Sequence, residues 1–164
     1  MTNLTFEDAI LALILDGAED PNEIASILKV DVDEVRRALK NLELEGLVRV
    51  EEKGFWIFKK KIYKLTSRGY EKAVEAKKKI SRVAEEVRNT LEKIRKGLIS
   101  KDDVISELEP YIPFFPLFLY FNLLDLMLLL PLIELPFIAS IFEDYEDYED
   151  LGGDIDSFED IDIS

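Results

Sequence analysis

The stretch that decides the fold runs over residues 21–65 and reads PNEIASILKVDVDEVRRALKNLELEGLVRVEEKGFWIFKKKIYKL. Its apolar spacing predicts a short helix beginning at Pro21, a tight turn, and a second helix that ends at Gly46. Strand-like sequence follows, interrupted by one turn rich in charge and glycine. This order of elements is that of a helix-turn-helix followed by a β-hairpin wing.

The second helix of the pair, residues 32–44, is predicted to be amphipathic. Asp31 is a favourable N-cap, and Glu34 three residues later completes a capping box. Apolar residues with helical spacing predict one buried face; they are Val35, Ala38, Leu39 and Leu42. The polar residues on its other faces are expected to meet solvent or a partner; they are Arg36, Arg37, Lys40 and Asn41.

The hairpin is predicted to be aromatic and basic. Val48 and Val50 alternate with charged residues, as in a half-buried strand. The returning strand is expected to carry the run FWIF, residues 55–58, ahead of three lysines. Two interpretations stay open for this run: packing on the core or on a second subunit, or contact with nucleic acid or protein. The wing residues considered for contact with DNA are Lys53, Trp56, Lys59, Lys60, Lys61 and Lys64.

Several runs of this stretch resemble a known family. The runs EIA at 23–25, VRRAL at 35–39 and LELEGLV at 42–48 resemble the winged helix of MarR-like and PadR-like transcription regulators. The run YKLTSRGYE at 63–71 resembles the way those families leave the wing and enter the next helix. The resemblance covers about residues 5–97 and implies a DNA-binding winged helix, with an archaeal source expected.

Composition and charge divide the chain into two unlike parts. All 21 Lys and Arg lie at or before Lys101, against 18 acidic residues, a balance of +3. The other 17 acidic residues lie after it, and they bring the net charge to −14. The chain has no Cys and no His, which excludes disulfides and thiolate zinc sites and removes the commonest general base. We therefore expect neither an enzyme nor a cofactor, and, with no secretory signal, a cytoplasmic protein.

A long fourth helix is predicted from Arg68 to about Lys96, capped by Ser67. Its apolar residues approximate a heptad repeat at the lower limit of a coiled coil. At about 1.5 Å per residue the helix is about 45 Å long, which favours a dimerisation helix. The residues assigned to dimerisation are Ala73, Ile80, Val87, Leu91 and Ile94. The alternative is antiparallel pairing with the chain's own C-terminal part.

Residues 111–142 are apolar and punctuated by prolines, and two interpretations stay open for them. In the first, 117–130 and 132–142 are helices buried in a dimer core. In the second, 114–133 anchors the protein to the cytoplasmic face of a membrane. That span would place Asp125 near its middle, at a cost of about 2.5–3.5 kcal/mol.

Residues 143–164 form a tail with 11 acidic residues. Acidic tails are commonly disordered, but apolar residues recur in this one at three- or four-residue spacing. They allow a sharper hypothesis, in which the tail mimics a nucleic-acid backbone, docks on the basic wing and makes the DNA-binding face self-inhibited.

The sequence as a whole predicts a mainly α protein with a small β-hairpin wing, organised in four parts. They are a winged helix-turn-helix (1–66), a long helix and a short one (67–110), an apolar segment (111–142) and the tail (143–164). The expected function is a homodimeric regulator that binds double-stranded DNA, with helix 32–44 in the major groove and wing lysines on phosphates. The alternative is a protein-interaction or membrane-anchored adaptor that does not read DNA. Asp33 and Glu34 weaken the DNA hypothesis, because acids at the start of this helix repel phosphates.

Overall fold

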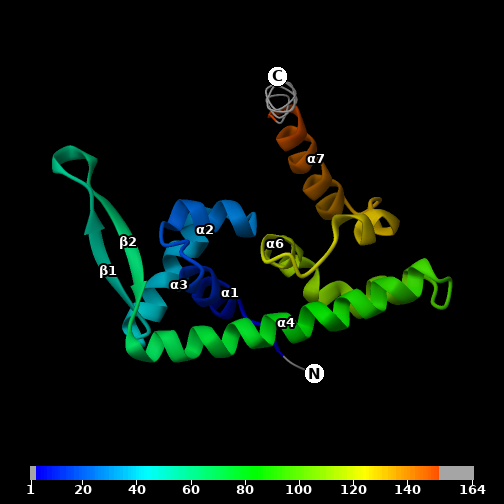
Figure 1. The fold of residues 1–164 in the computed structure, drawn as a ribbon, viewed down its shortest axis with the longest axis horizontal. Coiled ribbons are helices and arrows are strands. Elements are labelled where there is room, and N and C mark those ends of the chain that lie inside the picture. The colour runs from blue at the N-terminus through cyan, green and yellow to red at the C-terminus, as the bar shows by residue number, and fades with distance from the viewer. Residues whose placement is uncertain (1–2, 152–164) are drawn as a thin grey trace, which may run out of the picture.

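A helix-turn-helix, a long hairpin and one extended helix organise the chain in the computed structural model (Figure 1). The structure describes residues 3–151, and the side chains of residues 3–144. In chain order the elements are α1 (Phe6–Leu15), α2 (Pro21–Leu28), α3 (Val32–Leu44), β1 (Val48–Lys53), the 3₁₀ helix η1 (Trp56–Phe58), β2 (Lys60–Leu65), α4 (Ser67–Arg95), α5 (Lys101–Leu108), η2 (Glu109–Phe114), α6 (Phe115–Tyr120), η3 (Leu126–Leu132) and α7 (Pro136–Leu151). The predicted fold class, mainly α with a two-stranded wing, is confirmed.

Local capping fixes where α1 and α3 begin, and a left-handed residue fixes where α2 ends. Thr5 and Asp8 form the reciprocal capping box of α1, with both hydrogen bonds at 3.1 Å. Asp31 caps α3 as predicted, but its carboxylate accepts from the N–H of Asp33 at 2.9 Å. The capping box expected with Glu34 is therefore not the geometry that α3 uses. Lys29 ends α2 in the left-handed conformation and makes the tight turn toward α3.

The second strand of the wing is shorter, and the turn before it longer, than the sequence predicts. β1 and β2 pair antiparallel from Val48 opposite Leu65 to Lys53 opposite Lys60. Residues 55–58 therefore lie in the turn, and the prediction that they form the returning strand is wrong. The reason lies at Gly54, whose φ is +111° and where an added Cβ would lie 2.4 Å from the carbonyl oxygen of Phe58. The chain folds back tightly over this glycine, so the apolar run has no strand partner.

Main-chain contacts hold the root of the wing to the body. The N–H of Tyr63 donates to the carbonyl of Glu19 at 3.0 Å, which joins β2 to the loop between α1 and α2. Thr66 caps α4 by accepting from the N–H of Gly69 at 3.0 Å, so the predicted cap at Ser67 is displaced by one residue. A Cβ at Gly69 would lie 1.7 Å from the carbonyl oxygen of Leu47, so the start of α4 requires glycine there.

The apolar seam of α4 is covered by this same chain. Ala73, Ile80, Val87 and Leu91 are buried, and Ile94 is partly buried. The helices that pack against α4 are α1, α5, α6 and η3. The C-terminal part of the chain thus covers some of the seam, as the alternative interpretation has it, and α1 covers the rest. A second chain could reach the residues assigned to dimerisation only by displacing these helices.

The apolar segment is broken into short pieces rather than the two long helices expected. The expected helix 117–130 is interrupted, because α6 ends at Tyr120 and Asn122 adopts a left-handed conformation. Asp125 then caps η3 by accepting from the N–H of Met127 at 3.0 Å, and its side chain is exposed. The short helices of the apolar segment contribute to a core shared with α1 and α4 of the same chain.

The second expected helix of this segment, 132–142, starts later and runs further. It is α7, which begins at Pro136 and continues into the acidic tail as far as Leu151. Asp144 on α7 forms an ion pair with Lys29 at the end of α2. The hypothesis of a tail docked on the wing concerns residues 143–164, of which residues 152–164, and the side chains from residue 145 on, lie outside the described residues. Within residues 3–151 no helix combines the length and the apolar composition needed to cross a bilayer.

Candidate nucleic-acid interface

A groove of about 710 Å³ lies between α3, the wing and the start of α2. Arg36 and Lys40 enter it from α3, one helical turn apart, and Lys60 and Lys61 enter it from β2. These four cations are among the ten residues predicted to contact DNA. They are separated by up to 25 positions in the sequence, and the fold brings them to one concave surface. We call this surface the basic groove.

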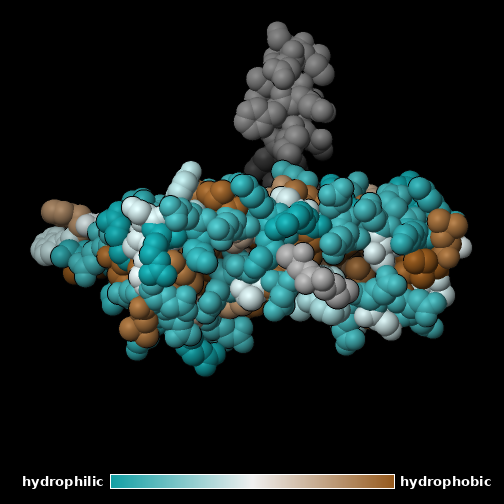
Figure 2. All heavy atoms as spheres, turned by 90° about the horizontal axis from the view of Figure 1, so that it is seen from below, coloured by the Kyte–Doolittle hydropathy of each residue, from teal (hydrophilic) through white to brown (hydrophobic). Residues whose placement is uncertain are grey.

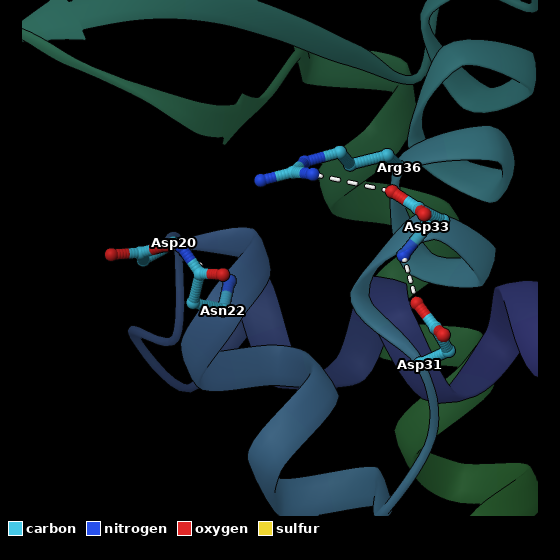
Figure 3. A network of polar contacts seen from close by, with 5 residues as sticks. All are labelled: Asp20, Asn22, Asp31, Asp33 and Arg36. Atoms are coloured by element: carbon cyan, nitrogen blue, oxygen red, sulfur yellow. Dashed lines mark hydrogen bonds and ion pairs between the residues drawn. The ribbon is translucent and has the colours of Figure 1, made fainter.

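Two carboxylates also line the basic groove, and they reduce its charge. They are Asp20 at the start of α2 and Glu43 on α3. A third acid, Asp33, lies one turn before Arg36 and accepts from the Arg36 guanidinium at 3.3 Å. Figure 3 shows the Arg36 side chain leaving α3 on the side where α2 begins. Both partners of that pair are exposed, so the pair is weak and leaves Arg36 able to exchange it for another anion.

Asp20 has two tasks in the basic groove. One carboxylate oxygen accepts from the N–H of Asn22 at 2.9 Å and so caps α2 (Figure 3), while the other accepts from the Lys60 ammonium at 3.2 Å. Burial alone would raise the pKa of Asp20, but these two interactions outweigh it and hold the pKa below its ordinary value. Asp20 is therefore ionised at neutral pH and neutralises part of the charge of Lys60.

Tyr63 supplies a neutral hydroxyl to the basic groove. Burial and then the negative charge of Glu43 raise the pKa of Tyr63, with the charge of Arg36 opposing them. The phenol therefore stays protonated at neutral pH and can both donate and accept a hydrogen bond. Tyr63 also carries the main-chain bond to Glu19, so its position is fixed by the wing root.

The remaining predicted DNA-contacting residues lie outside the basic groove. Arg37 and Asn41 are exposed on an adjoining side of α3, one residue further round the helix. Lys64 forms an ion pair with Glu19 at the wing root. The other three, Lys53, Trp56 and Lys59, lie toward the end of the wing. Of the ten residues, four thus line the basic groove, two lie on another side of α3, one forms an ion pair at the wing root, and three lie toward the end of the wing.

The end of the wing carries a second, shallower recess of about 520 Å³. It is lined by Gly54, Phe55, Trp56 and Lys59. Lys59 lies 3.9 Å from Glu52 across the hairpin, a long and exposed pair. This recess is apolar except for Lys59, in contrast to the basic groove.

Three ionisable residues of the basic groove were not among the sequence predictions. They are Asp20, Glu43 and Tyr63. An acidic residue before Pro21 is a recognisable N-cap signal, and it could have been found. Its contact with Lys60, 40 positions away, could not, because it depends on how the wing root packs against the α1–α2 loop.

Comparison with known proteins finds solved structures that resemble part of this chain. No protein-family model matches the chain, and no curated protein matches it either. One single-site variant of ZitR from Lactococcus lactis is 22% identical, with a TM-score of 0.48, over 64% of this chain and 70% of that chain. Another ZitR variant is 21% identical, with a TM-score of 0.47, over 66% and 72%. The adhesin competence repressor AdcR from Streptococcus pyogenes is 14% identical, with a TM-score of 0.47, over 70% and 81%.

Similarities of this size assign neither a family nor an activity to the chain. The functional argument therefore depends on the geometry of the basic groove and of the wing.

Proposed function

We propose that this protein is a transcription regulator that binds double-stranded DNA through α3 and the wing. The observation that carries the proposal is the basic groove, where Arg36 and Lys40 of α3 meet Lys60 and Lys61 of β2. Thirteen residues make α3 about 20 Å long, and a B-DNA major groove about 12 Å wide accepts such a helix. The groove beside it would then run along one phosphate backbone.

Each cation has a different role in this arrangement. Arg36 and Lys40 lie beyond the acidic first turn of α3, so the helix would dock by its middle rather than by its start. Arg37 and Asn41 adjoin them and are suited to guanine and adenine edges respectively. Lys61 and Lys60 would hold phosphates, which gives affinity without sequence preference. Lys53, Lys59 and Lys64 would add to the same field along the wing.

The proposal includes a homodimer, which would place two α3 helices on a two-fold site. Because this chain covers the seam of α4, the dimer surface would have to lie elsewhere. Exposed large apolar residues gather near the end of α4 and on η3, and they are Leu98, Met127, Leu130 and Ile133. The test is the mass in solution of the wild type and of Met127→Glu with Ile133→Glu. A monomeric wild type, or a dimer that survives both changes, would reject this surface.

The central experiment is a salt titration of binding to a random duplex, read by fluorescence anisotropy. We expect log K to fall linearly with log salt, with a slope of about −0.9 for each phosphate neutralised. Arg36→Ala with Lys40→Ala should weaken binding by at least about tenfold, since each contact contributes about 1–3 kcal/mol. The matched control is Arg82→Ala, which removes an exposed arginine of α4 away from the basic groove. Wild-type protein that shows no salt-dependent binding would contradict the proposal and favour the adaptor alternative.

Self-inhibition by the tail is a further part of the proposal. The exposed carboxylates of Glu143 and Asp144 begin a run that could compete with phosphates for the wing lysines. Deleting residues 145–164 keeps the ion pair between Asp144 and Lys29 and removes the rest of the tail. We expect this deletion to raise DNA affinity at fixed salt, and an unchanged affinity would end the idea.

A further inference from the structure

The wing ends in four consecutive large apolar side chains that the protein does not bury. Phe55, Trp56, Ile57 and Phe58 are between 77% and 82% exposed. Figure 2 shows brown apolar atoms projecting at the end of the molecule where the wing lies. Single exposed apolar residues are ordinary, but four together on one projection mark an interaction site. We call these four residues the wing tip.

The backbone of the wing tip is held in an unfavourable conformation. Trp56 has a φ of +65°, which is rare for a bulky side chain. Gly54 at +111° and the hydrogen bond from the N–H of Phe58 to the carbonyl of Phe55, at 3.2 Å, keep the turn closed. In the free chain the wing tip thus combines strain with exposed apolar area, and neither is offset by contacts within the chain.

Cations surround the wing tip, and the nearby acids have partners. The lysines within three residues of it along the chain are Lys53, Lys59, Lys60 and Lys61. Of the two acids on β1, Glu51 pairs with Arg49 at 2.6 Å and Glu52 lies 3.9 Å from Lys59. An apolar end with a basic collar is therefore the chemistry that any partner of the wing tip must match.

We propose that the wing tip inserts into the surface of an anionic lipid bilayer. Trp and Phe are the side chains that concentrate at the membrane–water interface. Apolar groups of surface-bound segments are buried about 5–10 Å into the boundary between headgroups and acyl chains. At that depth the lysine collar lies at the level of the headgroups, where each lysine near an anionic surface contributes to binding. One insertion therefore accounts for all four apolar residues and for the lysines around them.

The excess of acidic charge lies in the part of the chain that does not form the wing. Residues 1–101 carry a balance of +3, and the other 17 acidic residues follow Lys101. Figure 1 draws α7, on which the acidic tail begins, apart from the hairpin, and exposed charges more than about 8 Å apart are largely screened at physiological salt. A duplex fits the wing tip less well, since a minor groove about 6 Å wide would leave part of the four side chains against phosphates.

Membrane binding by the wing tip does not require DNA binding, but the two interactions would use two of the same lysines. Lys60 and Lys61 belong both to the basic groove and to the collar of the wing tip. A protein seated on a bilayer would therefore have these cations engaged with headgroups. Anionic membrane and duplex DNA would then compete for the wing.

The chain contains its own probe, because Trp56 is its single tryptophan. The full-length protein is mixed with vesicles of phosphatidylcholine alone and with vesicles that also contain phosphatidylglycerol. With the anionic vesicles we expect co-sedimentation and a shift of Trp56 emission to shorter wavelength, as the indole leaves water. Both signals should weaken as salt rises, and pure phosphatidylcholine should bind less.

Variants locate the binding while Trp56 is kept as the probe. Phe55→Ser, Ile57→Ser and Phe58→Ser together should reduce vesicle affinity by more than about tenfold. Lys53→Gln with Lys59→Gln, which leaves the basic groove intact, should reduce the preference for phosphatidylglycerol. The matched control is Leu44→Ser, which removes an equally exposed apolar side chain from the last residue of α3. Far-ultraviolet circular dichroism checks that each variant is folded.

Three results would overturn the proposal. They are the absence of binding to anionic vesicles, binding that the triple serine variant retains, and a Trp56 emission change caused by duplex DNA but by no vesicle. The last result would assign the wing tip to DNA instead. Vesicle binding by a protein that does not bind duplex would reject the regulator proposal and leave this one standing.

Discussion

Two aromatic runs of similar composition have opposite positions in this molecule. Residues 55–58, FWIF, are almost fully exposed at the wing tip, whereas residues 114–121, FFPLFLYF, contribute Phe115, Leu117 and Phe118 to the core at 0% exposure. Composition therefore does not decide burial. The difference lies in the neighbours: a glycine turn and lysines project the first run outward, and α4 lies where it can cover the second (Figure 1).

The largest expected effect comes from truncating one aromatic residue in each run. Phe118→Ala should lower the free energy of unfolding by about 3–5 kcal/mol, because it leaves a cavity in a packed core. Phe58→Ala should change it by no more than about 0.5 kcal/mol, because that ring is already in water. Urea denaturation followed by circular dichroism compares the two variants. Equal losses would mean that the wing tip is buried in solution, against a second copy or against the chain itself.

The intermediate effect comes from Gly54, the residue that turns the first run outward. Gly54→Ala places a Cβ against the Phe58 carbonyl oxygen at a φ that alanine disfavours. We expect a loss of about 1 kcal/mol in unfolding free energy, because the turn can rearrange without disturbing the core. Trp56 emission should change in the free protein, since its surroundings depend on this turn. An unaltered spectrum and stability would show that the turn is not held closed by Gly54.

The same contrast shows what could be read from the sequence. The winged helix was predictable, because it depends on caps, helical spacing and glycines within a few residues of each other, as around Asp31 and Gly46. The C-terminal helices were not predictable. The apolar sequence from Leu117 to Leu130 is as compatible with one long helix as with the observed order of α6, a turn and η3. What separates these solutions is the left-handed Asn122 and the cap by Asp125. The elements on either side of this turn, α6 and η3, both pack against α4.

The candidate site was predicted in its residue types but not in its arrangement. Arg36 and Lys40 followed from the amphipathic pattern of α3, and Lys60 and Lys61 from the charge of the wing. That these four share a groove depends on how the wing packs beside α3. Arg37 lies on another side of α3, and Lys64 is held by Glu19. For α4 the sequence predicted burial but not the partner. A heptad-like pattern indicates that one face of a helix is covered, and it does not indicate whether the same chain or a second chain covers it.

The smallest expected effect concerns Asp20, whose carboxylate ties Lys60, at the tip-side end of β2, to the start of α2. Asp20→Asn keeps an equally good N-cap for α2 and removes the charge that pairs with Lys60 at 3.2 Å. Lys60 is then available to a phosphate, so we expect DNA affinity to rise by about two- to threefold. The salt slope should steepen by up to about 1. Asp8→Asn is the matched control, since it frees Lys79 of α4, which is not among the residues proposed to contact DNA.

The pH dependence gives the same contact a second readout. Because the pKa of Asp20 is held below its ordinary value, the stability that its ionised form contributes is present at neutral pH. That contribution should be lost as the pH falls through the folded-state pKa of Asp20. Titration of its carboxyl carbon by NMR should therefore give a midpoint below that of a free aspartate, and Lys60→Met should move the midpoint upward. A midpoint that Lys60→Met leaves unchanged would mean that Lys60 does not lower the pKa of Asp20, and that this ion pair does not tie the wing to α2 in solution.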